Sequence, residues 1–341
     1  MPLPGNLLTT AMAVMPHTDA QRALDSALGL DIPFWPQLPR LNYYEDMYVQ
    51  ASEHFPGAVL DMKNQRLSFS MDRFIAELEE ALAHMAEPEY FDISPTYSAV
   101  YHQFLGLDLK HRPAIRGQLE GPISFGFNVK DTDDRPIIFD DSVRPFMLEF
   151  MAQRVNTQLR RLKRMNDNAF MFVDEPGLQF VFSGVSGYGE TAAKRDLETF
   201  FSYIERPRGV HLCGNPDWDF LLNLDLEVLS LDMYSNGERF VSYVKSIRRF
   251  LDRGGVIIWG MIPTQTENYQ KQGLEELASR LKGLWNTLDK AGIDRDFLLS
   301  RSLLSPATCC LVNSDGEATV DQAFAAVRSL SQNLRAELLG L

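Results

Sequence analysis

Short apolar runs alternate along the chain with longer segments in which apolar residues recur every three or four positions. Runs of the first kind are typical of buried strands, and segments of the second kind are typical of helices with one buried face. This alternation predicts parallel strand–helix units. Eight strands are expected, beginning near residues 7, 32, 114, 169, 209, 228, 256 and 297, and the clearest helices are expected over 142–165, 190–204, 274–288 and 320–338.

Eight such units predict an α/β fold of the (β/α)8 type, a TIM barrel, in which residues 1–341 form a single domain. No linker rich in Pro, Gly or Ser divides the sequence. Residues 39–113 interrupt the alternation and are expected to be an insertion or elaboration, with a small hairpin over 60–69 and a helix over 71–85. Pro33 and Pro36 make the second strand irregular, because proline has no N–H to donate.

Composition narrows the classes of partner and compartment. The chain has 341 residues, of which 45% are hydrophobic, so it can bury a large core without disulfides. Its 33 basic and 46 acidic residues give a formal charge of -13, which argues against nucleic acid or an anionic membrane surface as the main partner. Three cysteines, no signal-peptide pattern and no apolar stretch of bilayer length predict a cytoplasmic protein.

Polar and chemically reactive residues collect just past the carboxyl ends of the predicted strands. In a barrel these ends share one face, which is where active sites are built. Residues far apart in the sequence can therefore form one site. The residues at these positions are His17, Ser124, Asp174, Glu175, His211, Cys213, Asp232, Thr264, Cys309 and Cys310.

The three cysteines of the chain suggest a zinc site on this face. His211 and Cys213 are two residues apart on a predicted strand, so their side chains point the same way. Imidazole nitrogen and thiolate sulfur are ligands that zinc prefers, and Cys309 or Cys310 would supply a third. The fourth position would then be open or filled by a carboxylate, as in catalytic zinc sites. The alternative is that the cysteines are small buried hydrophobic residues and His211 is a core histidine.

Four short motifs carry a resemblance to a known superfamily. They are GPIS at 121, VDEPGL at 173, HLCG at 211 and SPATCCL at 305, in that order. In this set the chain resembles the uroporphyrinogen decarboxylase and cobalamin-independent methionine synthase superfamily, and it is most similar to the zinc methyltransferase branch. The similarity covers the chain from about Met12 to Val312, and the ordered set is more specific than any single motif.

The resemblance implies a (β/α)8 barrel whose zinc ion binds the thiol of an acceptor such as homocysteine. His211 and Cys213 match the family's His-x-Cys ligands, and Cys309 best matches its late cysteine. Asp232 lies where the methionine synthases place a glutamate ligand. Asp174, in the DEP motif, matches the acid that holds the amino group of the substrate. The resemblance thus implies methyl transfer to homocysteine, which gives methionine.

The other residues of this face have weaker assignments. Glu175 is grouped with Asp174 and Asp232 as a candidate catalytic residue. The glycine-rich segment 184–189 lacks the lysine and the spacing of a phosphate loop, and we expect it to be a mobile loop. Substrate contacts are expected from His17, Ser124, Thr264 and Cys310.

Departures from the family pattern bear on the carboxylate contact and the donor. Ala13 and Val14 stand where methionine synthases usually carry Gly-Ser, which removes part of the expected contact to the substrate carboxylate. The length matches one of the two barrels of the full-length cobalamin-independent enzymes. A methylated corrinoid protein is therefore the expected methyl donor, with folate as the other candidate.

Other functions stay open at this point. One alternative is a non-catalytic barrel that binds a corrinoid or a partner protein, and another is methyl transfer to a different thiol. Uroporphyrinogen decarboxylase activity is less favoured, because no arginine-rich N-terminal motif is present and the net charge is negative.

Overall fold

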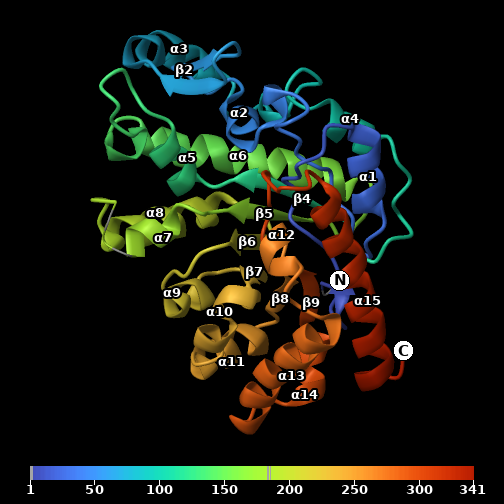
Figure 1. Cartoon of the computed structure of the whole chain (residues 1–341). Helices are drawn as coiled ribbons and strands as arrows, with labels where there is room; N and C mark the ends of the chain where they lie inside the picture. Colours follow the sequence, from blue (N-terminus) through green and yellow to red (C-terminus); the bar gives the residue numbers. More distant parts are fainter. Residues whose placement is uncertain (1–2, 183, 185) are drawn as a thin grey trace.

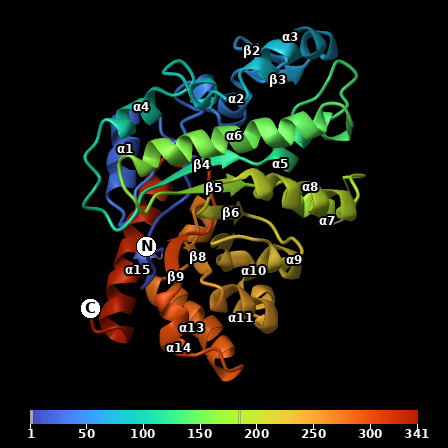
Figure 2. The same ribbon diagram turned by 180° about the vertical axis from the view of Figure 1, so that it is seen from behind.

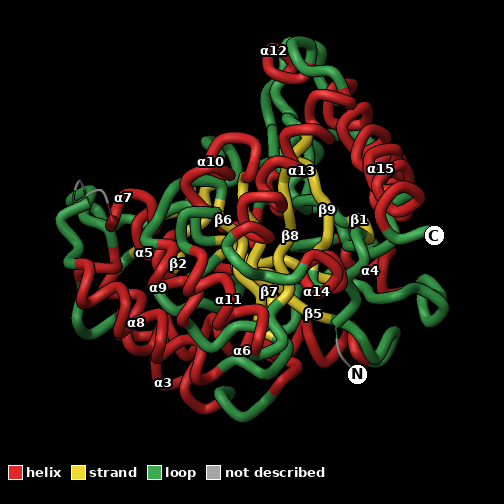
Figure 3. The backbone as a smooth tube through the Cα atoms, turned by 90° about the horizontal axis from the view of Figure 1, so that it is seen from below, coloured by secondary structure: helices red, strands yellow, loops and turns green. Residues whose placement is uncertain are grey.

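The computed structural model describes residues 3–182, 184 and 186–341, and its centre is a curled parallel sheet. The strand order is β1-β9-β8-β7-β6-β5-β4, and each neighbouring pair is parallel. Helices surround the strands, as Figures 1 and 3 show. The strands of this sheet are β1 (Leu8–Thr9), β4 (Arg116–Glu120), β5 (Phe170–Asp174), β6 (Arg208–Leu212), β7 (Val228–Asp232), β8 (Val256–Ile262) and β9 (Ser302–Pro306).

The helices follow the strands closely along the chain, and α6, α8, α13 and α15 begin and end within two residues of the expected helices. None of the described helices is both long and apolar enough to cross a membrane. The α-helices are α1 (Ala20–Leu28), α2 (Met47–Ser52), α3 (Met71–Ala83), α4 (Ala99–Leu105), α5 (Pro122–Asn128), α6 (Arg144–Lys163), α7 (Leu178–Phe182), α8 (Glu190–Tyr203), α9 (Trp218–Asn223), α10 (Met233–Phe240), α11 (Val244–Asp252), α12 (Thr266–Tyr269), α13 (Leu274–Lys290), α14 (Arg295–Ser300) and α15 (Ala318–Leu338).

The second expected strand is not a regular strand. Residues 32–37 lie between the segment that contains β1 and strand β4, and they reach both through isolated bridges, Val14 with Gln37 and Phe34 with Arg116. The backbone N–H of Arg116 donates to the Pro33 carbonyl oxygen at 3.0 Å. The two prolines of this segment cannot donate, so a continuous ladder does not form. The sheet therefore has seven regular strands, and the eight that the sequence predicted are not all formed in the described chain.

The last expected strand also begins later than predicted. Residues from 297 to 300 belong to helix α14, which Asp294 caps by accepting a hydrogen bond from the Phe297 N–H at 2.8 Å. Leu298 and Leu299 are buried on this helix, so an apolar run that resembled a strand is one buried helical turn. Strand β9 starts only at Ser302.

Alternate residues of the strands pack into two separate cores. The smaller core contains Phe170 and Phe172 of β5 with Val228 of β7, Ile258 of β8 and Leu303 of β9. The intervening residues of β5, such as Met171 and Val173, belong to the larger core that the helices cover. This alternation is the one expected when a parallel sheet curls around its own interior.

Residues 39–113, which the sequence predicts to be an insertion or elaboration, contain an antiparallel hairpin, β2 (Ala58–Asp61) with β3 (Arg66–Phe69), and the helices α2, α3 and α4. Of these elements, α2, α3, β2 and β3 lie above helices α5 and α6 (Figure 2). Buried polar side chains tie this segment to the sheet. Gln37 Nε2 donates to Gln50 Oε1 at 2.9 Å and to the carbonyl oxygen of Gln118 on β4 at 3.3 Å. Within the segment, the Glu45 carboxylate accepts from Gln50 at 3.2 Å and from the Ser98 hydroxyl at 2.6 Å.

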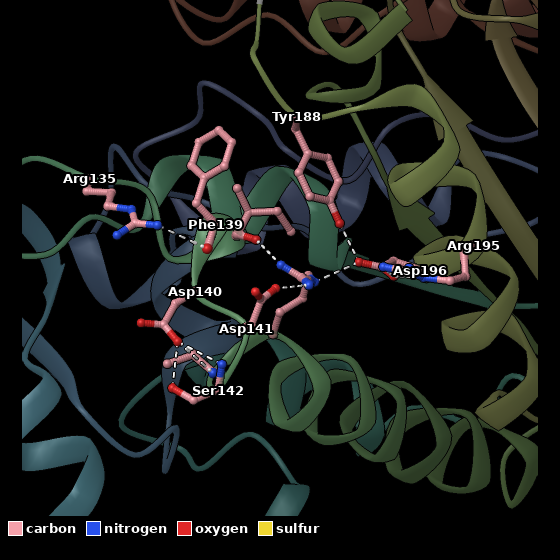
Figure 4. Close-up of polar contacts among 11 residues, drawn as sticks. Arg135, Phe139, Asp140, Asp141, Ser142, Tyr188, Arg195 and Asp196 are labelled. Carbon is pink, nitrogen blue, oxygen red and sulfur yellow. Dashed lines mark hydrogen bonds and ion pairs between the residues drawn. The ribbon is translucent and has the colours of Figure 1, made fainter.

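The glycine-rich segment 184–189 lies partly outside the described residues, because residue 185 is among those left out. Its Tyr188 is buried, and its ring packs edge-on against Phe127 at 5.9 Å and Phe139 at 6.0 Å. The Tyr188 hydroxyl donates to Asp196, which also forms an ion pair with Arg144 at 2.9 Å (Figure 4). The C-terminal end of this segment is therefore anchored to α6 and α8.

Helix α13 offers a direct test of the outer core. Leu288 is fully buried on this helix, so Leu288→Ala should lower the free energy of unfolding by about 2–5 kcal/mol through lost apolar burial and the cavity left behind. Leu82→Ala on α3 is the control, since Leu82 is 53% exposed and its loss should change stability by less than about 0.5 kcal/mol. Urea unfolding of both variants measures the difference, and equal effects would contradict the assigned packing of α13.

Candidate metal centre

The end of β6 places His211 and Cys213 side by side. His211 Nε2 lies 3.0 Å from Cys213 Sγ, and His211 Nδ1 lies 3.0 Å from the hydroxyl oxygen of Ser230, its register partner on β7. Burial, assisted by the charge of Arg116, lowers the pKa of His211 to about 3, so its imidazole is neutral. With Nδ1 engaged by Ser230, the ring directs Nε2 toward the thiol, which is the arrangement of a metal-binding histidine.

Cys309 reaches the same place from the loop after β9. The Cys213 and Cys309 thiols share a hydrogen bond, which raises the pKa of Cys213 and lowers that of Cys309. Cys310 is directed elsewhere, because its sulfur contacts Asn313 Oδ1 at 3.2 Å and the Val312 carbonyl oxygen at 3.5 Å. The structure thus brings His211, Cys213 and Cys309 together and leaves Cys310 outside this group.

The donor atoms of this group fit zinc in kind, although their present spacing is not that of a ligand set. One imidazole nitrogen and two sulfurs are typical zinc ligands. In the described part of the chain, however, no three His, Cys, Asp or Glu side chains are already disposed to hold a metal ion. An ion between them would have to replace the hydrogen bond that now joins the two thiols. A zinc centre here is accordingly a proposal, which rests on the contacts and on donor chemistry.

A buried carboxylate, that of Asp174, lies beside the thiols. Asp174 ends β5 and is the register partner of both His211 on β6 and Glu120 on β4. Asp174 Oδ2 accepts a hydrogen bond from Gln118 Nε2 at 2.5 Å, and its Oδ1 is buried without a hydrogen-bond partner in the described structure. Burial, and secondarily Cys309, raises the pKa of Asp174 well above its usual range.

Glu120 is a second buried carboxylate with an unpaired oxygen, and the sequence analysis did not identify it. Its Oε1 is also buried without a hydrogen-bond partner among the described residues, while its carboxyl group is hydrogen-bonded to the Tyr48 hydroxyl of α2. Burial raises its pKa, and the nearby Asp174 raises it further. A signal was present in the sequence, because Arg116, Gln118 and Glu120 place a polar residue at every second position of a buried strand.

Glu175 and Ser124 bind each other. Glu175 Oε2 accepts from the Ser124 N–H at 2.9 Å and the Ser124 hydroxyl at 2.6 Å, and its Oε1 accepts from the Ile123 N–H at 3.0 Å. The Ser124 oxygen accepts from the Gly177 N–H at 2.8 Å. Burial raises the pKa of Glu175 to about 7. These bonds fix the loops after β4 and β5, and the predicted catalytic and substrate-binding roles of the pair stay predictions.

Gly121 is required by this arrangement. A Cβ atom at this position would lie 2.2 Å from Glu175 Oε1, far inside contact distance. The glycine of the GPIS motif thus makes room for the Glu175 carboxylate of the DEP motif.

The remaining predicted site residues fall into two groups. Asp232 Oδ1 caps α10 by accepting from the Ser235 N–H at 2.8 Å, and its charge acts on Cys213. The Thr264 hydroxyl lies 3.1 Å from that of Thr308, next to Cys309 in the chain. His17, in contrast, is turned to the outer helices, with Nε2 3.0 Å from Asp321 Oδ1 on α15. The structure therefore does not bring His17 to the thiols.

A buried arginine of the curled sheet is a further residue that the sequence analysis did not identify. Arg116 is fully buried, with its guanidinium 4.5 Å from the ring centre of Phe34 and 4.4 Å from that of Phe172. Its Nε donates to the Thr10 hydroxyl oxygen at 3.0 Å, and burial lowers its pKa to about 9. Arg116 stands before Gln118 and Glu120 on the same strand, and its positive charge favours the ionised form of Asp174.

Comparisons with known proteins bear on the fold. No family model matches the sequence, and no curated protein matches it. Among solved structures, a B12-independent methionine synthase from Shewanella sp. W3-18-1 in complex with selenomethionine is similar with a TM-score of 0.55 and 15% identity, over 100% of each chain. A methyltransferase from Methanosarcina mazei is similar with a TM-score of 0.53 and 12% identity, over 98% of this chain and 96% of that one. At these identities the likeness concerns the fold alone, and the chain has the barrel-like α/β fold of these two proteins.

Proposed function

We propose that the protein is a zinc-dependent methyltransferase that moves a methyl group to the thiol of homocysteine and so forms methionine. The observation that carries this proposal is the convergence of His211, Cys213 and Cys309 at the carboxyl ends of β6 and β9. Active sites of barrel enzymes occupy this face. The names of the two structural neighbours, a methionine synthase and a methyltransferase, agree with this reaction class.

Each residue has a defined task in this proposal. His211, held by Ser230, and the two cysteines would hold the zinc ion, and Asp232, whose charge acts on Cys213, is a candidate for a further ligand. Bound zinc would keep the acceptor thiol as a thiolate at neutral pH, whereas a free thiol with a pKa of about 8.5 is mostly protonated. The protein then has to place that sulfur and exclude competing nucleophiles, and no general base is needed for the displacement.

The two unpaired carboxylate oxygens support an amino acid as the acceptor. Asp174 Oδ1 and Glu120 Oε1 are buried acceptors without a donor in the described structure, and such groups are costly unless a partner completes them. An ammonium group offers three donors and one positive charge. Homocysteine carries this group beside its thiol chain, whereas a simple thiol does not. The Shewanella protein is described in complex with selenomethionine, which is also an amino acid.

For the methyl donor we propose a methylated corrinoid protein, with a methylated folate as the alternative. The length of the chain, which matches one barrel of the two-barrel enzymes, favours the corrinoid. The Shewanella neighbour has the same extent and is named B12-independent, so a single barrel does not by itself require a corrinoid. Assays with methylcobalamin and with 5-methyltetrahydrofolate distinguish the two donors.

The proposal is tested with protein purified without chelator. We expect about one zinc per chain and methionine formation from homocysteine with methylcobalamin or with 5-methyltetrahydrofolate, lost on zinc removal and restored by zinc. Metal analysis and chromatographic detection of methionine give the two readouts. Protein that takes up no zinc and forms no methionine with either donor would reject the proposal. Tight corrinoid binding without turnover would instead favour the non-catalytic alternative.

A further inference from the structure

Gln118 occupies a position between the buried arginine and the carboxylate next to the thiols. Its Oε1 accepts two hydrogen bonds, from the Ala13 backbone N–H at 3.0 Å and from Arg116 Nη1 at 3.1 Å. Neither donor can accept a hydrogen bond, so the amide oxygen must face them. The amide nitrogen must then face Asp174, where it donates to Oδ2 at 2.5 Å. The orientation of this amide is therefore decided by its neighbours.

The neighbours of Gln118 are themselves fixed. The Arg116 guanidinium is stacked between Phe34 and Phe172, and its Nε donates to Thr10. The Thr10 hydroxyl in turn donates to the Ile32 carbonyl oxygen at 3.0 Å. An unbroken chain of hydrogen bonds thus runs from the backbone of residue 32 through Arg116 and Gln118 to Asp174. Buried hydrogen bonds of this kind hold the side chains that they join in one geometry, and Arg116 Nη2 and Asp174 Oδ1 are the atoms of this chain left without a partner in the described structure.

We propose that Gln118 is a positioning residue that holds Asp174 by Oδ2 and so presents Oδ1 to the ammonium group of the acceptor. The inference rests on the proposed function, because it concerns recognition of the amino group of the same acceptor. It assigns the discrimination between an amino-acid thiol and a plain thiol partly to a residue that does not touch the substrate. Second-layer hydrogen bonds of this kind commonly decide how well a contacting group is oriented.

Two variants remove the bond in different ways. Gln118→Met keeps the length of the side chain and deletes both amide atoms, and Gln118→Asn keeps the amide but is too short to span from Arg116 to Asp174. Either change should raise KM for homocysteine roughly tenfold to a hundredfold, the usual worth of a hydrogen bond to a charged group, with a smaller change in kcat. The kcat/KM for 4-mercaptobutanoate, which is homocysteine without its amino group, should stay the same.

The matched control is Gln158→Met on α6. Gln158 is also a fully buried glutamine, and its amide atoms have no hydrogen-bond partner in the described structure. The Gln158→Met variant should leave the ratio of kcat/KM for homocysteine to kcat/KM for 4-mercaptobutanoate at the wild-type value. Thermal unfolding of all three variants verifies that they are folded, and the Gln118→Asn variant serves if Gln118→Met does not fold.

The outcomes separate positioning from a general structural role. Equal loss of kcat/KM for both thiols in the Gln118 variants would overturn the inference, since a distorted barrel would harm both substrates alike. A crystal structure of the Gln118 variant gives a readout that does not depend on turnover. If the Asp174 carboxylate kept its wild-type place there, the positioning role would be rejected whatever the substrate. If it turned away but wild-type protein did not methylate homocysteine, the proposed function would fail while the Gln118–Asp174 coupling stood.

Discussion

Replacing Cys213 by serine is expected to abolish zinc binding and to slow methyl transfer to homocysteine by about a thousandfold or more. Cys213 contacts both other candidate ligands, the imidazole of His211 and the thiol of Cys309. A hydroxyl in its place is a poor zinc ligand, because it stays protonated at neutral pH. Metal ions contribute several kcal/mol to such reactions, and each factor of ten in rate is about 1.4 kcal/mol.

The matched control for this change is Cys310→Ser. Cys310 contacts Asn313 and Val312 instead of the other thiols, so this variant should still bind about one zinc per chain. Elemental analysis of both variants, together with methionine formation by the Cys213 variant, gives the comparison. Zinc retained by the Cys213 variant at the wild-type level would exclude Cys213 as a ligand. Zinc lost from the Cys310 variant alone would move the third ligand to that residue.

The pairing of His211 with Cys213 could be predicted because it depends on local geometry. Residues two positions apart in an extended segment point the same way whatever the rest of the chain does. The choice between Cys309 and Cys310 could not be made from their positions in the sequence. They are neighbours in a loop, and the choice depends on tertiary contacts. These are the hydrogen bond from Cys310 to Asn313 and the hydrogen bond between the thiols of Cys309 and Cys213.

The buried carboxylates Asp174 and Glu120 show a second limit of prediction from the sequence. Asp174 was found through its motif, whereas Glu120, Gln118 and Arg116 were not, although they alternate on one strand. Buried strands of parallel sheets are usually apolar on both faces, so polar residues within such a strand have no obvious assignment from pattern alone. Their role emerges only from the register, which places Glu120 opposite Asp174, and from the stacking of Arg116 against Phe172 inside the curled sheet.

Errors in the fold arose where local signals competed. The run from residue 297 has the apolar character of a strand, yet Asp294 caps it as a helix, and that cap was the better signal. The segment 32–37 has the position of a strand, but its prolines remove the hydrogen bonds that would make it regular. His17 follows an extended segment as predicted, and its ring turns outward because Asp321 of α15 offers a hydrogen-bond partner there.

Asp174→Asn is expected to raise KM for homocysteine by about a hundredfold or more while zinc content stays at the wild-type level. Gln118 presents an N–H to this position, so the amide oxygen of the new asparagine should turn toward Gln118. Its NH2 group would then face the substrate ammonium, and two donors would meet where a charge-assisted hydrogen bond is proposed. Removing one partner from a buried charged pair costs about 3–5 kcal/mol.

Comparison of homocysteine with 4-mercaptobutanoate tests whether Asp174 binds the ammonium group. The kcat/KM for 4-mercaptobutanoate should be nearly the same in the Asp174→Asn variant and in wild type, because this thiol has no ammonium group to meet the carboxylate. A similar fall for both thiols would instead assign Asp174 to the metal centre, since its charge also acts on Cys213 and Cys309. An unchanged KM for homocysteine would remove Asp174 from amino-group recognition and leave Glu120, the other buried carboxylate with an unpaired oxygen, as the residue to replace next.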